Sequence, residues 1–541
     1  MQLSENGLKN RQEWLDKGYQ LPEFDREAVK AKTKETPEWI HFGAGNIFRA
    51  FQANLLQGLL NKGECETGLI VAEGFDYEII EKMYLPHDSY SVLATLKVDG
   101  TVEKTVVGSI VESLTLDPEN TADFSRLKEV FTADSLKMAS FTITEKGYSL
   151  VNGKGETLPA VEEDFKKGPE QATSYIGKVA ALLYTRYQAG AKPVAMVSMD
   201  NCSHNGDKLY AAISTFANEW AKNGVAEAGF VDYINDKTKV GFPWSMIDKI
   251  TPRPDANVEK ILADDGLEEL EPVITSKKTY VAPFVNAEEC QYLVIEDAFP
   301  NGKINLTPGG VIYTTRENVD RVEKMKVCTC LNPLHTSLAV FGCLLGYERI
   351  YEEMRDPVLK KMVETIGYKE GLPVVVKQDL LDPEQFIGEV INVRLPNPFM
   401  PDTPQRIATD TSQKLAIRFG GTISAYAAAD DKDVKSLKLI PLVLAGWLRY
   451  LMAIDDSGKA FELSPDPQLT TVCPYVQDIK LGEIDGAEAK AKAKAEPILK
   501  RTDIFGVDLY EIGLADTVIG YFKELIAGPG AVKATLEKYV L

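Results

Sequence analysis

Residues 39–63 of the chain read WIHFGAGNIFRAFQANLLQGLLNKG, and this stretch decides the fold. The apolar run at its start is typical of a short buried strand, and two glycines follow it directly. After the glycines, apolar residues recur at helical spacing, and a second apolar run, GLIVAEGF (68–75), follows the helix. The order strand, glycine turn, helix, strand predicts the first βαβ unit of a doubly wound α/β domain with a parallel sheet.

The next segment has a different period. Apolar and polar residues alternate between Ser89 and Leu116, and Asp99–Gly100 divides the alternation into two runs. An Asp-Gly pair between alternating runs is a strong hairpin signal. We therefore expect antiparallel strands added to the parallel core.

Two further buried strands are expected at 138–144 and 194–199, each after a helical segment at roughly 122–131 and 171–187. Both strands end in polar residues, TEKGY (144–148) and DNCSHNG (200–206). Ligands of open α/β sheets bind at the carboxyl ends of the strands, so these stretches are expected to lie at a site. The first half of the chain is thus predicted to be a Rossmann-type domain.

The second half of the chain shows long helical patterns in place of strand-helix alternation. They lie at 322–347, 348–367, 441–453, 514–527 and 531–539. We expect an N-terminal arm over 1–37, the Rossmann-type domain over 38–318 and a mainly α-helical C-terminal domain over 319–541. The low-complexity run at 487–496 is expected to be a solvated helix.

The amino-acid composition of the chain limits the classes of molecule that it is expected to bind. The 541 residues include 60 Lys+Arg and 80 Asp+Glu, a net charge of −20, which argues against nucleic acid or an anionic membrane. The longest apolar stretches, at 338–345 and 440–454, are too short to span a bilayer and are expected to be buried helices. Seven scattered cysteines and a polar N-terminal segment predict a reduced, cytoplasmic protein.

The glycine turn is the first candidate site. Gly43 and Gly45 let the backbone approach a pyrophosphate, and the helix start at Asn46, Ile47 and Phe48 supplies unpaired N–H groups. Phe48 stands where the full G-x-G-x-x-G fingerprint has its third glycine. The alternative is a turn that serves packing alone.

An acid at the end of the next strand supports the dinucleotide interpretation. Glu73 follows Gly43 by 30 residues, where a carboxylate would bind the adenosine ribose, and Asp76 is a second candidate. An acid at this place repels a 2′-phosphate, which favours NAD over NADP as the cofactor.

A second candidate site is the stretch EKMKVCTCLNPLH (323–335). It holds Glu323, Lys326, Asn332 and His335 in a segment that reads as helical before Pro333. A buried lysine can act as a general base, an asparagine amide can donate to an oxyanion, and a histidine can orient a hydroxyl. The alternative is that the lysine reaches the surface and the histidine is an ordinary core residue.

No metal is expected. The cysteines at 328 and 330 do not meet the C-x₂₋₄-C spacing of zinc sites, and the chain has only four histidines. A G-x-S-x-G nucleophile elbow and a G-x-x-x-x-G-K-[ST] phosphate loop do not occur, so hydrolase and kinase functions lose support.

Eight ordered stretches resemble the polyol-specific long-chain dehydrogenases, the mannitol dehydrogenase family. They are GAGNIFRAFQA (43–53), FTITEKGY (141–148), VSMDNCSHNGD (197–207), MIDKITPRP (246–254), LVIEDAFPNG (293–302), EKMKVCTCLNPLH (323–335), RIATDTSQK (406–414) and GWLRYLMAIDDSGKAFELSPDP (446–467). The resemblance implies an NAD-dependent, metal-free oxidoreductase, with the active site in the cleft between a Rossmann-type and a helical domain.

The resemblance also implies roles for single residues. Lys326 matches the general base, Asn201 and Asn332 match the oxyanion asparagines, and His335 matches the histidine that orients the substrate. Three further residues match a glutamate that gates proton release, the acid of D-x-I-T-P and a substrate-binding arginine. They are Glu323, Asp248 and Arg406, in that order.

The chain departs from the family pattern at one point. The pattern has four residues between the lysine and the asparagine, whereas five separate Lys326 from Asn332, and Pro333 replaces the usual small residue. An extra residue inside a helix needs a bulge or a shift. Lys324 is the alternative base, although it points to another side of the helix.

The CLNPLH variant and the chain length resemble the fructuronate reductases, which interconvert D-fructuronate and D-mannonate. Mannitol 2-dehydrogenase and tagaturonate reductase are the alternative enzymes, and a non-catalytic redox sensor or scaffold is a fourth possible function.

A sugar acid needs a cation for its carboxylate, and Arg406, Lys414 and Arg253 are candidates. In a chain of net charge −20, such binding depends on local cations. The expected assembly is a monomer or a small homo-oligomer.

Overall fold

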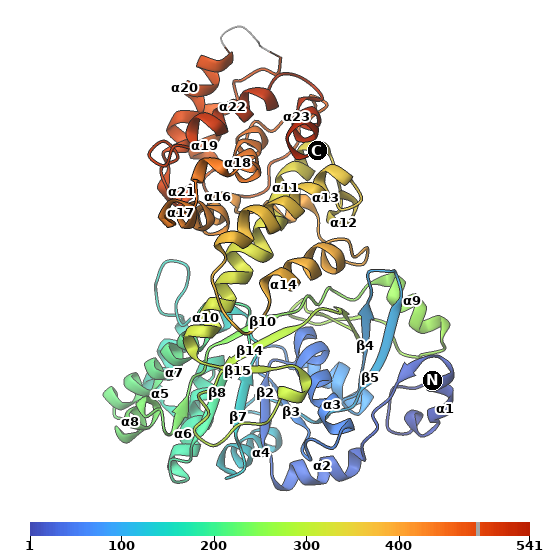
Figure 1. Cartoon of the computed structure of the whole chain (residues 1–541). Helices are drawn as coiled ribbons and strands as arrows, with labels where there is room; N and C mark the ends of the chain where they lie inside the picture. The colour runs from blue at the N-terminus through green and yellow to red at the C-terminus, as the bar shows by residue number, and fades with distance from the viewer. Residues whose placement is uncertain (483–486) are drawn as a thin grey trace. The chain divides into compact units, whose positions relative to one another are not determined.

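The computed structural model describes residues 1–482 and 487–541 (Figure 1). The chain divides into two compact units, one of residues 1–97 and 101–320 and one of residues 98–100 and 321–541. The division falls within helix α10 (Arg316–Met325).

The first unit is built on a six-stranded parallel sheet with strand order β6-β3-β2-β7-β8-β9. The strands are β2 (Trp39–Phe42), β3 (Leu69–Glu73), β6 (Ile110–Thr115), β7 (Met138–Phe141), β8 (Val194–Ser198) and β9 (Val240–Gly241). In chain order this is 3-2-1-4-5-6, the arrangement of dinucleotide-binding domains. The prediction of a doubly wound parallel sheet is confirmed.

Both faces of this sheet are covered, because alternate side chains of each strand point to opposite sides. Ile40 and Phe42 join one core with α4 (Thr121–Thr132), α6 (Tyr175–Gln188) and α7 (Asn205–Lys222). Trp39 joins the other core with α3 (Asn54–Asn61) and the π-helical segment η2 (Phe48–Ala53). Burial on both faces explains why these strands read as continuous apolar runs.

The predicted hairpin is present in a second sheet. Strands β4 (Ser91–Leu96) and β5 (Val102–Val107) pair antiparallel around the Asp99–Gly100 turn. The sheet order is β1-β5-β4-β13, with β1 (Tyr19–Gln20) and β13 (Phe284–Glu288) at its edges. β5 ends at Val107, and the chain turns at Gly108 into β6 of the parallel sheet.

The N-terminal arm packs onto the first unit. It forms α1 (Arg11–Asp16), β1 and α2 (Arg26–Glu35), and β1 pairs parallel with β5. The buried guanidinium of Arg26 donates to the carbonyl oxygens of Gly108, Ile110 and Asp88 at 3.0, 2.9 and 2.6 Å. The arm is therefore a structural part of this unit, which its polar composition did not reveal.

The remaining strands of the first unit form two small sheets. In one, β10 (Ser245–Asp248) pairs antiparallel with β14 (Tyr292–Glu296), which pairs parallel with β15 (Ile312–Thr314). In the other, β11 (Val273–Ile274) and β12 (Tyr280–Val281) pair antiparallel. The unit's other helices of seven residues or more are α5 (Pro159–Lys167), α8 (Gly229–Asn235) and α9 (Ala256–Asp264).

The second unit is helical, as predicted. Its longer helices are α11 (Asn332–Leu345), α13 (Pro357–Thr365), α14 (Pro383–Glu389), α17 (Gly421–Ala428), α18 (Leu439–Tyr450), α19 (Leu469–Val476), α20 (Ala487–Leu499), α22 (Ala515–Leu525) and α23 (Ala531–Val540). Every residue of α18 is buried, which explains its continuous apolar sequence. The run at 487–496 is helical, as expected.

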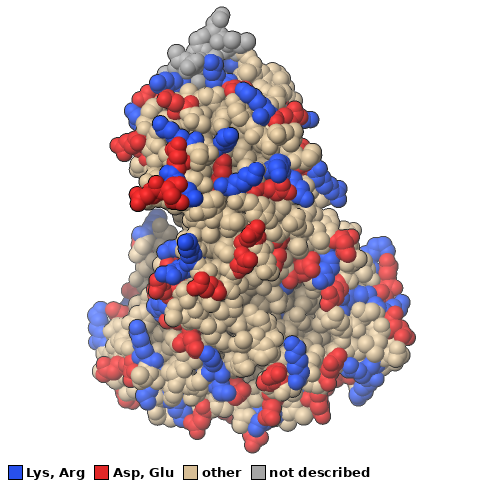
Figure 2. Space-filling model, viewed as in Figure 1, with Lys and Arg blue, Asp and Glu red and all other residues tan. Residues whose placement is uncertain are grey.

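One helical stretch, Arg316–Leu345, is long and apolar enough to cross a membrane by length and composition. However, 78% of its most apolar window is buried inside the protein, as in the core helix of a globular domain. Acidic and basic side chains are interspersed over the face seen in Figure 2, without a large area of one sign.

Candidate functional site

The glycine turn follows β2, and its two glycines differ in the space that the structure leaves for a side chain. Gly43 has φ +107°, and a Cβ there would lie 2.3 Å from the carbonyl oxygen of Thr142. A side chain is therefore excluded by backbone conformation and by packing. A Cβ on Gly45 would meet no atom of the described structure within 4 Å. Packing within the protein therefore does not require glycine at 45, and the space beside its backbone is open to a ligand.

The helix after the turn places the next three predicted cofactor residues. Asn46 is held by Arg49, whose buried guanidinium donates to Asn46 Oδ1 at 2.9 Å and to the carbonyl oxygen of Ala282 at 2.7 Å. Ile47 is partly exposed. Phe48 is fully buried and stacks on His41 with 4.2 Å between ring centroids. The side chain of Phe48 thus belongs to the core, and only its backbone remains for a cofactor contact.

Glu73 lies beside the glycine turn, as predicted. Its Oε2 accepts from the N–H of Ala44 at 2.8 Å, and its Oε1 accepts from Phe75 N–H at 2.7 Å and Asp76 N–H at 3.1 Å. The carboxylate thus joins the end of β3 to the turn. Each oxygen has two lone pairs, so one acceptor position is left on Oε2 for a ribose hydroxyl.

Asp76, the second predicted ribose acid, is only 2% exposed and accepts a hydrogen bond from Thr275 Oγ1 at 2.6 Å. A residue absent from the prediction lies nearby: Lys178 of α6 donates to Tyr77 Oη at 2.8 Å and to the Gly74 carbonyl at 3.3 Å. Burial lowers the pKa of Lys178 to about 8. This cation lies at the loop after β3, where the sequence showed only acids.

A pocket of about 280 Å³ in the first unit is lined by residues at the helix start after the glycine turn, residues after the ends of β7 and β8, and residues at the end of β10 and just beyond it. The lining includes Ile47, Thr144, Asp200 and the predicted Asn201. The polar stretches at 144–148 and 200–206 were expected at the carboxyl ends of the strands of this sheet. The structure brings both stretches to one pocket.

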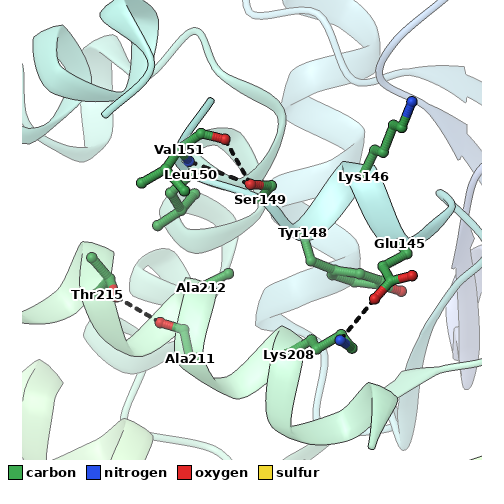
Figure 3. Close-up of a pocket in the computed structure, with 10 residues that line it drawn as sticks. All are labelled: Glu145, Lys146, Tyr148, Ser149, Leu150, Val151, Lys208, Ala211, Ala212 and Thr215. Carbon is green, nitrogen blue, oxygen red and sulfur yellow. Dashed lines mark hydrogen bonds and ion pairs between the residues drawn. The ribbon is translucent and has the colours of Figure 1, made fainter. Parts of the chain in front are cut away.

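Asp200 organises this pocket. Its carboxylate accepts from the N–H of Ile143 at 3.0 Å, the N–H of Thr144 at 2.8 Å and the hydroxyl of Tyr148 at 2.5 Å. Burial raises the pKa of Asp200 despite these bonds. Figure 3 shows the same turn from a second pocket of about 540 Å³, where Glu145 pairs with Lys208 of α7 at 2.8 Å.

Asn205, the first residue of α7, fixes the polar stretch after β8. Its fully buried amide donates to the carbonyl oxygens of Asp200 and Ser245 at 3.0 Å each and accepts from the Ser245 N–H at 3.0 Å. Ser245 starts β10, whose last residue is the buried Asp248. The predicted Asn201 and Asp248 are therefore carried by two segments that Asn205 joins.

In the second unit, Lys326 begins a π-helical segment, η8 (Lys326–Cys330), between α10 and α11. The N–H of Leu331 donates to the carbonyl oxygen of Lys326 at 3.1 Å, an i to i+5 bond. A π-bulge contains one more residue than an α-turn. The bulge that the extra residue required is therefore present between Lys326 and Asn332. Lys326 is buried, at 3% exposure.

His335 lies on α11, one turn after Asn332. Its Nε2 is 3.6 Å from Oδ2 of the buried Asp402, and Arg406 bonds the other oxygen of that carboxylate. Burial, together with the charges of Arg418, Arg406 and Arg394, lowers the pKa of His335 to about 3. The imidazole is therefore neutral at physiological pH.

Further cations lie near His335. Lys414 donates to the carbonyl oxygen of Thr409, and burial and the charges of Arg418 and Arg406 lower its pKa. Arg418 follows Lys414 by four residues and donates to Thr336 Oγ1. The structure thus brings the predicted His335, Arg406 and Lys414 into one cation-rich cluster.

The sequence analysis did not single out Lys178, Asp402 or Arg418, and it placed Asp200 at the site only as part of the polar stretch 200–206. Arg418 also had a usable signal, because its spacing of four residues from Lys414 places both cations on one helix face. Among residues 1–482 and 487–541, no group of three or more His, Cys, Asp or Glu side chains is arranged to hold a metal ion.

Two matches to known families cover most of the chain. The mannitol dehydrogenase Rossmann domain matches residues 37–308, and the mannitol dehydrogenase C-terminal domain matches residues 318–525. The chain belongs to the mannitol dehydrogenase family. The resemblance inferred from the eight motifs is thereby confirmed.

Relatives within the mannitol dehydrogenase family are similar over the whole length. The D-mannonate oxidoreductase of Thermotoga maritima is 51% identical over 100% of this chain and 99% of its own. Among solved structures, a substrate-free D-sorbitol dehydrogenase has a TM-score of 0.77 at 24% identity, covering 96% of this chain and 97% of its own. The Pseudomonas fluorescens mannitol 2-dehydrogenase, in ternary complex with NAD and D-mannitol, has a TM-score of 0.66 at 24% identity, covering 99% of both chains.

Proposed function

We propose that this protein is an NAD-dependent D-mannonate oxidoreductase that interconverts D-fructuronate and D-mannonate. The full-length similarity to the Thermotoga maritima D-mannonate oxidoreductase supports an oxidoreductase that acts on a secondary alcohol of a sugar acid. The cation-rich cluster at His335 is the observation that favours a sugar acid over a neutral polyol as the substrate. In a chain of net charge −20, a local excess of arginines has a physical reason if the ligand is an anion.

NAD is proposed as the cofactor because the first unit offers the features that a dinucleotide needs. The helix start after Gly45 presents N–H groups to a pyrophosphate, and Glu73 retains an acceptor for the ribose. When bound, the nicotinamide would accept or return the hydride. The complex of the Pseudomonas fluorescens relative with NAD agrees with this choice.

Lys326 is proposed as the general base. In the oxidative direction its neutral amine accepts the proton of the substrate hydroxyl, and in reduction its ammonium returns the proton to the carbonyl oxygen. Glu323 precedes it by three residues, on the same face of the helical stretch, and is proposed to pass the proton to solvent. This proton transfer does not require a metal ion.

The asparagines and His335 are proposed to hold the substrate. Asn201 and Asn332 donate amide hydrogens to the oxyanion that develops during hydride transfer. His335, kept neutral by burial and by the neighbouring arginines, orients a hydroxyl without adding charge. The carboxylate of Asp402 lies 3.6 Å from Nε2 of this imidazole.

The proposal is tested by NADH oxidation with D-fructuronate, D-tagaturonate and D-fructose under the same conditions, repeated with NADPH. We expect D-fructuronate with NADH to have the highest kcat/KM. Faster turnover of D-fructose would instead identify a mannitol 2-dehydrogenase, and faster turnover of D-tagaturonate a tagaturonate reductase. The absence of turnover with all three would favour a non-catalytic role.

A further inference from the structure

The carboxylate of a sugar acid needs a cation, and the structure distinguishes among the candidates. Arg406 is bonded to Asp402, and Lys414 is bonded to the carbonyl oxygen of Thr409. Arg253 is exposed in the loop after β10. Each of the three cations considered from the sequence is therefore engaged by the protein or open to solvent.

Arg418 is in a different situation. It lies in the π-helical segment η12 (Ala416–Gly420) and is partly buried. Its Nη1 donates to Thr336 Oγ1 on α11, next to His335. Among residues 1–482 and 487–541, no carboxylate pairs with it, and its Nε and Nη2 make no hydrogen bond.

An unpaired guanidinium in a partly buried place is costly unless an anion joins it. Burial lowers the pKa of Arg418 to about 10, so the group still carries its charge at neutral pH. The charge of Arg418 also acts on both His335 and Lys414. An anion bound here would relieve repulsion among several cations at once.

The geometry of the side chain suits a carboxylate in particular. Thr336 fixes one nitrogen and so limits the rotation of the guanidinium, while Nε and Nη2 form the edge that binds two carboxylate oxygens in parallel. A neutral polyol has no group that can use such an edge with full charge pairing. Thr336 lies within the first two turns of α11, as do Asn332 and His335.

We propose that Arg418 binds the carboxylate of the sugar-acid substrate and determines the preference for an acid over a neutral ketose. This inference rests on the proposed function. Arg418 is then a specificity-determining residue at the end of the substrate remote from the reacting carbon, while Lys326 and Asn332 act at the reacting carbon.

The test compares Arg418→Gln, Arg418→Lys and the control Arg355→Gln, which removes one exposed positive charge of the same unit. Each variant is assayed with D-fructuronate and D-fructose, and its folding is checked by thermal unfolding. Loss of one partner of a buried charge pair corresponds to roughly a 100-fold loss or more. We expect Arg418→Gln to lose about that much kcat/KM for D-fructuronate, mainly through KM, and less than about threefold for D-fructose.

Arg418→Lys keeps the charge but not the paired N–H edge, so we expect about a tenfold loss for D-fructuronate. If Arg418→Gln does not fold, the KM of Arg418→Lys for D-fructuronate tests the role of Arg418. Equal losses for both substrates, or an unchanged KM for D-fructuronate in a folded Arg418→Gln or Arg418→Lys protein, would overturn the role of Arg418 while the proposed function stands. A wild-type enzyme that prefers D-fructose would overturn both.

Discussion

The carboxylate of Asp200 accepts a hydrogen bond from the N–H of Thr144 at 2.8 Å, and Thr144 has φ 65° and ψ 158°. This is a backbone region that almost only glycine adopts, at a cost of about 1–3 kcal/mol for other residues. Such strain persists only where surrounding contacts impose it. Asp200 supplies one such contact to Thr144, and the Tyr148 hydroxyl donates to the other oxygen of the same carboxylate, at a pocket that also includes Asn201.

Asp200→Asn is expected to disturb this pocket. The amide keeps one acceptor oxygen, so either the Ile143 or the Thr144 N–H loses its partner, at about 1–3 kcal/mol. We expect kcat/KM to fall about 10-fold to 100-fold while the fold is retained. Asp232→Asn, at an exposed position of α8, is the matched control and should leave kcat/KM unchanged. Wild-type activity in a folded Asp200→Asn protein would contradict the role of Asp200.

The two glycines of the turn should respond differently to alanine. Gly43→Ala places a Cβ 2.3 Å from a carbonyl oxygen in left-handed backbone, so we expect the free energy of unfolding to fall by more than about 2 kcal/mol. Gly45→Ala meets no atom, so stability should change by less than about 1 kcal/mol. Its NADH Kd, measured by fluorescence titration, should rise at least about tenfold if the pyrophosphate lies there. An unchanged Kd would place the cofactor elsewhere.

Lys326→Ala is expected to lower kcat at least about 1000-fold with a small change in KM, because a general base acts in the transition state. Lys324→Ala is the comparison that separates the two lysines of the segment, and its loss of kcat should be far smaller. Near-normal kcat for Lys326→Ala, or a larger loss for Lys324→Ala, would refute Lys326 as the base.

Deletion of Cys328 tests the π-segment. If the bulge only accommodates an extra residue, its removal restores an α-turn and leaves Lys326 and Asn332 in their relative orientation. We expect at least about 10% of wild-type kcat/KM to remain. Deletion of Ala339, within regular α11, shifts the helix by about 100° and should abolish folding or activity. A folded Cys328 deletion without activity would show that the bulge itself is needed.

Glu353 of α12 (Ile350–Glu353) is fully buried, and neither carboxylate oxygen has a partner among the described residues. Burial raises its pKa well above the ordinary value. The unfolded chain ionises above about pH 4.3 while the folded one keeps the proton, so this group lowers the free energy of unfolding as pH rises toward the folded pKa. Glu353→Gln should remove that decline, which denaturant unfolding between pH 5 and 8 measures. Glu352→Gln is the control, and parallel pH profiles for Glu353→Gln and wild type would contradict the assignment.

The fold could be predicted from the sequence where local patterns decide it. Strand β2, the glycine turn and the following helix are neighbours in the chain, and burial on both faces marks the strands directly. The packing of the N-terminal arm could not be predicted, because β1 is two residues long and its partner β5 lies more than 80 residues away.

The site could be predicted only in part for the same reason. The motif residues Lys326, Asn332 and His335 are close in sequence, and the extra residue correctly indicated a bulge. Contacts between distant segments were not accessible: Asp402 reaches His335, and Arg418 reaches Thr336, across more than 60 residues. The burial of the Phe48 side chain was also missed, because core and ligand positions alternate within one helical turn.

The most direct test of the central claim is the ratio of kcat/KM for D-mannonate to that for D-mannitol in NAD reduction by the wild-type protein. A cation cluster that binds a carboxylate predicts a ratio of at least about 100, the effect of one strong charge pair on binding. A ratio below one would contradict the assignment of this chain as a sugar-acid dehydrogenase.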